Sequence, residues 1–185
     1  MSNKQLLITS SREPTNSVRT LLKDLNRVIP QSSRANRGKL SMNGLANLAL
    51  ILRVKYILVI GRWKGGPGKI EFYMASKRGL NQIPPIIFIG DYHLQREYGI
   101  THKKVKRGGI LSAFNPELQK ISKALSEILN MPIISHNQWE GYQAYMHVSN
   151  IKQNLTKLTF FSCKENLEIG PSLILRIIKW EIQEG

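Results

Sequence analysis

The segment Leu6-Leu7-Ile8-Thr9-Ser10-Ser11-Arg12-Glu13-Pro14 sets the first folding unit of this 185-residue chain. A short apolar run ends in a polar turn, and Pro14 suits the first turn of a helix, where a missing N–H costs nothing. Apolar residues then recur with the spacing i, i+3, i+4, i+7 from Val18 to Ile29, before Pro30. The sequence therefore predicts a strand, a turn and an amphipathic helix.

The rest of the chain continues to mix helical and strand patterns. Ser41 is a good N-cap for a second helix, and Asn115-Pro116-Glu117 is a strong start for a third. Strands are predicted over residues 56–60, 70–74 and 86–89, and near 142–148, 155–161 and 173–182. The connection over 61–69 is glycine-rich and basic, which indicates a flexible hairpin tip. These patterns predict an α/β (α+β) fold of two similar halves, about 1–83 and 84–185.

Positive charge is concentrated in the first three-fifths of the chain. The formal net charge is +15, from 27 Lys+Arg against 12 Asp+Glu. Residues 1–110 hold 20 of these cations and 5 of the acids, whereas residues 111–185 hold 7 of each. This asymmetry favours a surface for a polyanion, most simply a nucleic acid, and a basic patch that meets an acidic protein is the alternative.

The basic residues lie on predicted loops and helix faces. Arg19, Lys23 and Arg27 recur every four residues and form a row away from the apolar stripe of the first helix. Arginine suits phosphate because its planar fork makes two hydrogen bonds, and an aromatic ring on a hairpin tip suits an unpaired base. The predicted RNA-binding residues are Arg12, Arg19, Lys23, Arg27, Arg34, Arg37, Lys39, Arg62, Trp63, Lys64, Lys69, Lys103 and Lys104.

Catalytic and metal-binding motifs are missing from the sequence. The glycine-rich segment 61–69 does not fit the phosphate-binding loop of nucleotide hydrolases, and no G-x-S-x-G is present. The four histidines do not have zinc-ligand spacing, and Cys163 is the one cysteine. We therefore expect no enzyme activity, no catalytic residue, no metal and no cofactor.

Targeting signals are also missing. No apolar run approaches the ~20 residues of a membrane span, and the N-terminal segment lacks the apolar region and cleavage site of a signal peptide. A single cysteine makes no internal disulfide. The expectation is an intracellular protein that does not enter the membrane.

Two sequence motifs together resemble those of the Brix-domain family. The first is Ile8-Thr9-Ser10-Ser11-Arg12-Glu13-Pro14, followed by a basic helix and Arg34-Ala35-Asn36-Arg37-Gly38. The second is Leu167-Glu168-Ile169-Gly170-Pro171-Ser172, which runs into Leu175-Arg176-Ile177-Ile178-Lys179-Trp180. The resemblance covers nearly the whole chain and rests on the order and spacing of these motifs. Family members often have arginine where this chain has Ser172, and Arg176 lies nearby and joins the predicted RNA-binding residues.

The resemblance implies a ribosome-biogenesis factor that binds ribosomal RNA or its precursor, together with other ribosome assembly proteins. It also implies one Brix domain over residues 1–185, with two α/β halves similar to the anticodon-binding domains of class II aminoacyl-tRNA synthetases. The compact length resembles the short archaeal form, which implies a cytoplasmic protein, whereas a eukaryotic member would be nucleolar.

The leading hypothesis is therefore a non-enzymatic factor that binds ribosomal RNA during pre-rRNA processing and assembly. The first alternative is a protein-docking module of a pre-ribosomal complex, whose basic face meets an acidic partner. A lesser alternative is an RNA-processing enzyme.

Overall fold

The computed structural model describes residues 5–99, 104–112, 115–152 and 155–182. Its first elements are β1 (Leu6–Ser10), α1 (Asn16–Val28), β2 (Ser32–Arg34), α2 (Met42–Ile51), β3 (Tyr56–Trp63), β4 (Gly66–Ser76) and β5 (Gly79–His93). A single 3-10 turn, η1 (Gln95–Tyr98), follows β5. The remaining elements are β6 (Gly108–Ser112), α3 (Pro116–Leu129), β7 (Ile133–Ile134), β8 (Ala144–Lys152), β9 (Leu155–Ser162) and β10 (Glu168–Lys179). The predicted mixed α/β fold is confirmed.

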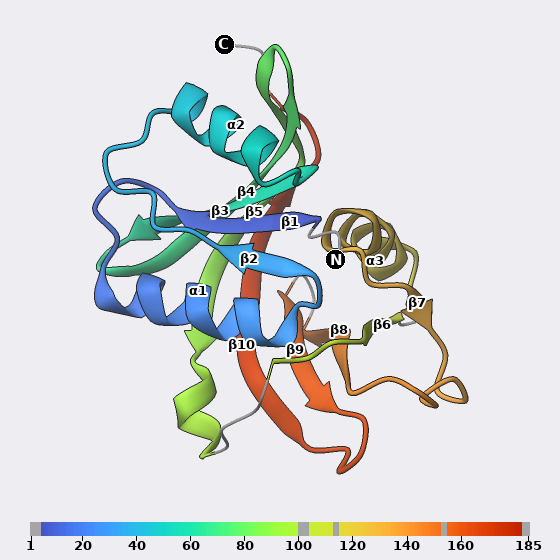
Figure 1. Cartoon of the computed structure of the whole chain (residues 1–185). Helices are drawn as coiled ribbons and strands as arrows, with labels where there is room; N and C mark the ends of the chain where they lie inside the picture. The colour runs from blue at the N-terminus through green and yellow to red at the C-terminus, as the bar shows by residue number, and fades with distance from the viewer. Residues whose placement is uncertain (1–4, 100–103, 113–114, 153–154, 183–185) are drawn as a thin grey trace.

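The described strands form one ten-stranded sheet in the order β2-β1-β3-β4-β5-β10-β9-β8-β6-β7 (Figure 1). The first five strands in the chain and the last five follow the same internal order, and β5 pairs with β10 in the middle. In each set, the outer three strands are parallel and the inner pairs are antiparallel. The expected division near residue 84 falls within β5, which by strand order completes the first set.

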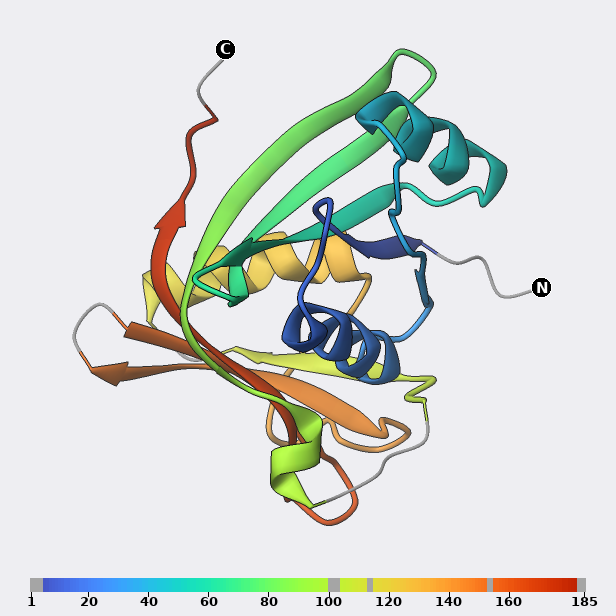
Figure 2. The same cartoon turned by 90° about the vertical axis from the view of Figure 1, so that its left-hand side faces the viewer.

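Both long helices lie on the concave side of this sheet. In Figure 2 the sheet curves from β3–β5 through β10 to β8 and β9, and it encloses α1 and α3. The two helices bury apolar stripes in one continuous core, which also contains Leu58, Phe72 and Phe160. These stripes are Val18, Leu21, Leu22, Leu25 and Val28 on α1, and Leu118, Ile121, Leu125, Ile128 and Leu129 on α3. The helical spacing of both stripes was predicted from the sequence.

The outer face of the sheet is covered differently at its two ends. Over β1 and β3, α2 packs Leu45 and Ala49 against Leu7 and Ile57. Over β6 and β8, the segment between β7 and β8 contributes aromatic side chains, and Trp139 lies edge-on to Tyr145 with ring centroids 4.4 Å apart. The unbroken apolar run 56–60 is explained by this arrangement, because β3 is covered by α1 on one face and by α2 on the other.

Local start signals are confirmed at two helices. The Ser41 side chain accepts a hydrogen bond from Gly44 N at 3.1 Å, and the Asn115 side chain accepts one from Glu117 N at 2.8 Å. Both contacts satisfy an N–H group that has no partner within its helix. At α1 the N-cap is Thr15, so Pro14 lies just before the helix and not in its first turn, where it was predicted.

Several boundaries differ from the prediction. The segment 61–69 forms the predicted hairpin, but its tip is only two residues long, because β3 continues to Trp63 and β4 begins at Gly66. Lys64 and Gly65 have φ of 45° and 83°, which forms the tight two-residue turn that joins twisted strands. The short strands β2, β6 and β7 were not predicted, because two to five residues carry little period-2 signal.

The closing Gly-Pro motif packs against η1. Gly170 has φ of 57°, and a Cβ at this position would collide with the ring of Tyr98. The Tyr98 hydroxyl lies 2.8 Å from both Glu168 Oε1 and Ser172 Oγ, and Thr159 and Lys157 also donate to Glu168. Burial favours the neutral carboxyl, but the hydrogen bonds from Thr159, Lys157 and Tyr98 outweigh it and lower the pKa of Glu168. Burial raises the pKa of Tyr98 to about 12.

This packing predicts an unequal cost for two glycine substitutions. Gly38 has φ of 53°, and a Cβ there would meet no atom within 4 Å, so Gly38→Ala carries the left-handed backbone cost alone, about 1 kcal/mol. Gly170→Ala adds the collision with Tyr98, so we expect a loss of roughly 3 kcal/mol. Urea unfolding of both variants measures the difference. Equal losses would show that Tyr98 does not restrict this position.

Candidate nucleic-acid interface

Three arginines come from the carboxyl ends of adjacent parallel strands. Strand β1 lies between β2 and β3 and is parallel to both, with Ile8 opposite Arg34 and Ser10 opposite Ile60. Arg34 ends β2, Arg12 follows β1 by two residues, and Arg62 lies two residues past Ile60. Because adjacent strands lie about 4.8 Å apart, the three side chains start from one edge of the sheet. This edge faces the viewer in Figure 2.

The loop after β1 and the β3–β4 hairpin are tied together at this edge. Arg62 lies 3.7 Å from the Glu13 carboxylate and donates to the Glu13 carbonyl oxygen at 3.4 Å. Ser17, in the first turn of α1, donates to the Gly65 carbonyl oxygen at 3.3 Å. Arg19 Nε donates to the Pro14 carbonyl oxygen at 3.3 Å, which places this residue beside the same loop. Residues far apart in the sequence therefore form one surface.

Trp63 is held at the hairpin tip with its side chain in solvent. A Cβ at Gly68 would collide with the Cβ of Trp63, so glycine lets the two strands approach there. The Trp63 side chain is 69% exposed. An indole fixed at its base and open to solvent can stack on an unpaired base. We define the carboxyl-edge cluster as Arg12, Arg19, Arg34, Arg62, Trp63 and Lys64.

The two other predicted residues of the loop after β2 have different environments. Lys39 is exposed. Arg37 is half-buried, and its guanidinium donates to the Leu40 carbonyl oxygen at 3.1 Å and to Met42 Sδ at 3.2 Å. Arg37 therefore fixes the loop that leads into α2.

The basic row of α1 is only partly exposed to solvent. Lys23 is exposed, whereas Arg27 is half-buried and its Nη1 lies 3.4 Å from Gln95 Oε1 of η1. Between them, Asp24 is 3% exposed and accepts a hydrogen bond from Gln95 N at 3.0 Å. Burial raises the pKa of Asp24. This end of α1 therefore holds η1 in place.

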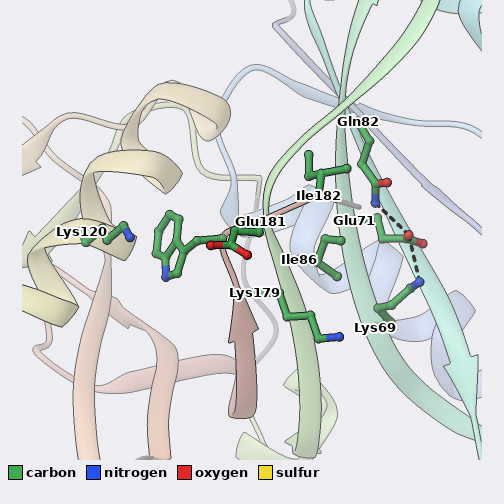
Figure 3. A pocket seen from close by; sticks show the side chains of 9 residues that line it. Lys69, Glu71, Gln82, Ile86, Lys120, Lys179, Glu181 and Ile182 are labelled. Atoms are coloured by element: carbon green, nitrogen blue, oxygen red, sulfur yellow. Dashed lines mark hydrogen bonds and ion pairs between the residues drawn. The ribbon is translucent and has the colours of Figure 1, made fainter. Parts of the chain in front are cut away.

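Lys69 and Arg176 lie away from the carboxyl-edge cluster. Lys69 is 2.9 Å from Glu71, which also accepts from Gln82, on one side of the pocket in Figure 3. Lys120 of α3 lies on the opposite side of that pocket, 4.3 Å from the Trp180 ring centroid. Arg176 is exposed and lines a neighbouring groove beside α3, with Glu117 and Lys120. The structure does not bring these two predicted residues to the edge.

A groove of about 730 Å³ runs beside β2, next to Arg34. Lys104 lines it and donates to the Ser32 carbonyl oxygen at 2.7 Å. Val105 N donates to the Arg27 carbonyl oxygen, and this contact places Lys106 in the same groove. Lys106 was not among the predicted site residues, because only the tertiary fold brings it beside β2. Lys103 lies outside the described residues.

Neither a metal centre nor a membrane-spanning helix is found in the described part of the chain. No group of three or more His, Cys, Asp or Glu side chains among the described residues is placed to hold a metal ion. None of the helices described has the length and hydropathy needed to cross a membrane.

Comparisons with known proteins found similar sequences and similar structures. No protein-family model matches the chain. A "probable Brix domain-containing ribosomal biogenesis protein" of Sulfurisphaera tokodaii is 36% identical over 124 residues, which are 67% of each chain. The crystal structure of a probable ribosomal biogenesis protein from Aeropyrum pernix superposes with a TM-score of 0.79 at 23% identity, covering 92% of this chain and 94% of that one. Mil, an archaeal Imp4-like protein, gives a TM-score of 0.66 at 19% identity, covering 95% and 99%. At these identities, the two structures show the fold alone.

The environments of Arg34 and Arg37 predict different effects on stability. Arg37→Ala removes two contacts that hold the loop before α2, so the free energy of unfolding should fall by about 1 kcal/mol. Arg34→Ala changes an exposed side chain, so the free energy should stay within ~0.5 kcal/mol of the parent. Urea unfolding midpoints measure both. A larger loss for Arg34→Ala would contradict these assignments.

Proposed function

We propose that this chain, which belongs to the Brix-domain family of ribosomal biogenesis proteins, binds ribosomal RNA or its precursor. The proposed binding surface is the carboxyl-edge cluster. In this proposal the protein acts in ribosome biogenesis as a binding factor and not as an enzyme. It would meet its RNA in the cytoplasm, together with other assembly proteins. The expected likeness to the anticodon-binding domains of class II aminoacyl-tRNA synthetases stays a prediction.

The observation that carries the proposal is the convergence of Arg12, Arg34 and Arg62 at one sheet edge, beside an exposed tryptophan. Loops at the carboxyl ends of parallel strands are a common place for ligands in α/β proteins. Guanidinium groups bind phosphate oxygens with two hydrogen bonds, and the indole adds a stacking surface. This combination fits an RNA segment with unpaired bases.

The local charge also favours a polyanion. No Asp or Glu occurs between Asp24 and Glu71 in the sequence. Glu13, which pairs with Arg62, is the acid that the described contacts place in the carboxyl-edge cluster. Lys23 on α1 and Lys104 and Lys106 beside β2 extend the positive surface on either side. A bound strand could therefore follow the edge beyond the cluster itself.

Binding to RNA should depend strongly on salt. If the five cations of the carboxyl-edge cluster each neutralise one phosphate, log K against log salt should have a slope of about −3.5 on single-stranded RNA. Arg12→Ala combined with Arg34→Ala should reduce the steepness by roughly 1.4 and weaken binding about tenfold. Fluorescence anisotropy with a labelled ribosomal RNA fragment measures both quantities.

The matched control is Lys77→Ala combined with Arg78→Ala, which removes the same charge from the β4–β5 hairpin tip. Strand β4 separates that tip from the carboxyl-edge cluster by roughly 33 Å, at about 3.3 Å per residue. The control should keep nearly the parent slope and affinity. Equal weakening by both pairs would mean that net charge, and not the carboxyl-edge cluster, binds the RNA.

Trp63 should contribute by stacking. Trp63→Ala is expected to weaken binding between roughly 5-fold and 150-fold, because stacking of one base on an aromatic ring contributes about 1–3 kcal/mol. Trp63→Phe should restore much of the affinity. The side chain is 69% exposed, so the unfolding midpoint should change little in either variant. Unchanged affinity of Trp63→Ala would remove the indole from the interface.

A further inference from the structure

Helix α2 exposes large apolar side chains to solvent and carries no charge. Its ten residues, Met42–Ile51, include no charged side chain in a chain of net charge +15. One side buries Leu45, Ala46 and Ala49. On the exposed side, Leu50 is 43% exposed and Ile51 is 77% exposed. Asn43 and Asn47 are also exposed, so the exposed apolar side chains of α2 itself belong to its last turn.

Exposed apolar side chains also flank the helix at both ends. Leu40, before the N-cap, is 37% exposed and packs beside Gly44, while Leu52, after the last turn, is 39% exposed. Four of the nine large apolar side chains exposed among the described residues therefore fall within residues 40–52. We define the α2 outer patch as Leu40, Leu50, Ile51 and Leu52. Exposed apolar side chains grouped on one element in this way are typical of a binding site for a partner.

The described part of the second set of strands has no counterpart of α2. In the second set of strands, α3 lies between β6 and β7 as α1 lies between β1 and β2, but no helix is found between β7 and β8 in the described segment 135–143. Trp139 and Tyr142 cover the outer face there. Helix α2 is therefore an addition to the first set, placed outside the curved sheet in Figures 1 and 2.

The α2 outer patch is surrounded by positive charge. The exposed cations near it are Lys39 before the helix, Arg53 and Lys55 after it, and Lys77 and Arg78 at the tip of the β4–β5 hairpin. Leu80, at the start of β5, packs into the same cluster as Ala49, which places that hairpin beside α2. Two acids near this rim are already paired with lysines: Glu127 of α3 lies 4.0 Å from Lys55, and Glu71, beside Tyr73 of the same cluster, pairs with Lys69.

This combination of surface and charge selects one kind of partner. A second copy of the chain would place like charges against this rim, which disfavours self-association. A nucleic acid would meet aliphatic side chains that offer no ring for stacking. An amphipathic helix with an apolar face and flanking carboxylates fits both the patch and the cations.

We propose that the α2 outer patch binds an acidic, amphipathic helix of a partner protein. This surface is separate from the carboxyl-edge cluster, and the proposal does not rest on RNA binding. The apolar side chains of the α2 outer patch provide the contact area, and the surrounding cations select partners that carry Asp and Glu.

The probe for the test is a synthetic helical peptide of about 16 residues, with leucines at i, i+3, i+4 and i+7 and glutamates on the other positions. The control peptide has the same leucines, with lysine in place of every glutamate. Binding to the full, isotope-labelled chain is followed by NMR, with amide shifts expected in residues 40–52 and 77–80. The glutamate peptide should bind at least about tenfold more tightly than the lysine peptide.

Variants separate the α2 outer patch from other apolar and basic surfaces. Leu50→Ser combined with Ile51→Ser should weaken peptide binding about tenfold, since both side chains lose their apolar contact. Ile177→Ser, a matched change at a side chain that is 48% exposed on β10, should leave peptide affinity unchanged. Arg12→Ala with Arg34→Ala should also leave it unchanged. Circular dichroism and urea unfolding confirm that each variant folds.

Four results would overturn the proposal. The first is equal binding of the lysine peptide, and the second is peptide affinity that survives the Leu50/Ile51 change. The third is a concentration-dependent dimer in sedimentation that Ile51→Ser abolishes, because a second copy would then occupy the patch. The fourth is ribosomal RNA that displaces the peptide and shifts the amides of α2, which would assign this face to nucleic acid.

Discussion

The pairing of β5 with β10 joins the two sets of strands into one sheet, and the other features of the fold depend on it. This antiparallel pair includes two register shifts, at Ile174/Leu175 and Leu175/Ile177. Register shifts bend a strand and increase its twist. The sheet curves there, so α1 and α3 share one core although each belongs to a different set of strands. Without this pair, each helix would leave part of its apolar stripe in water.

The two sets of strands share a topology but differ in what they present to solvent. The first set presents the carboxyl-edge cluster and the α2 outer patch, while the second covers its outer face with Trp139, Tyr142 and Tyr145. Charge also differs between the two sets, because residues 111–185, which contain most of the second set, hold equal numbers of cations and acids. A repeated fold has therefore acquired two different surfaces. The common core allows this, since it involves only the concave side of the sheet.

The sequence predicted the elements whose signal is local. Helical stripes, the caps Ser41 and Asn115, and the long apolar run of β3 are each read from fewer than about fifteen residues. The short strand β2 was missed, because its pairing with β1 depends on neighbours that the sequence does not place. The same limit applies to the site: Arg12 and Arg34 were chosen from their loops, but the role of Arg37 in its own loop and the position of Lys106 depend on tertiary contacts.

The two motifs that resemble the Brix-domain family serve different physical roles in this chain. Arg12 and Arg34 of the first motif lie exposed at the sheet edge, where they can meet phosphate. In the closing motif, Ser172 is 1% exposed and its hydroxyl contacts Tyr98, so it is closed to any ligand. Gly170 provides the space for the Tyr98 ring, and Glu168 forms an ion pair with Lys157 of β9. The closing motif therefore fixes η1 against β10, and η1 in turn contacts Asp24 and Arg27 of α1. Through these contacts, the second set of strands helps to position the helix that supports the basic edge of the first.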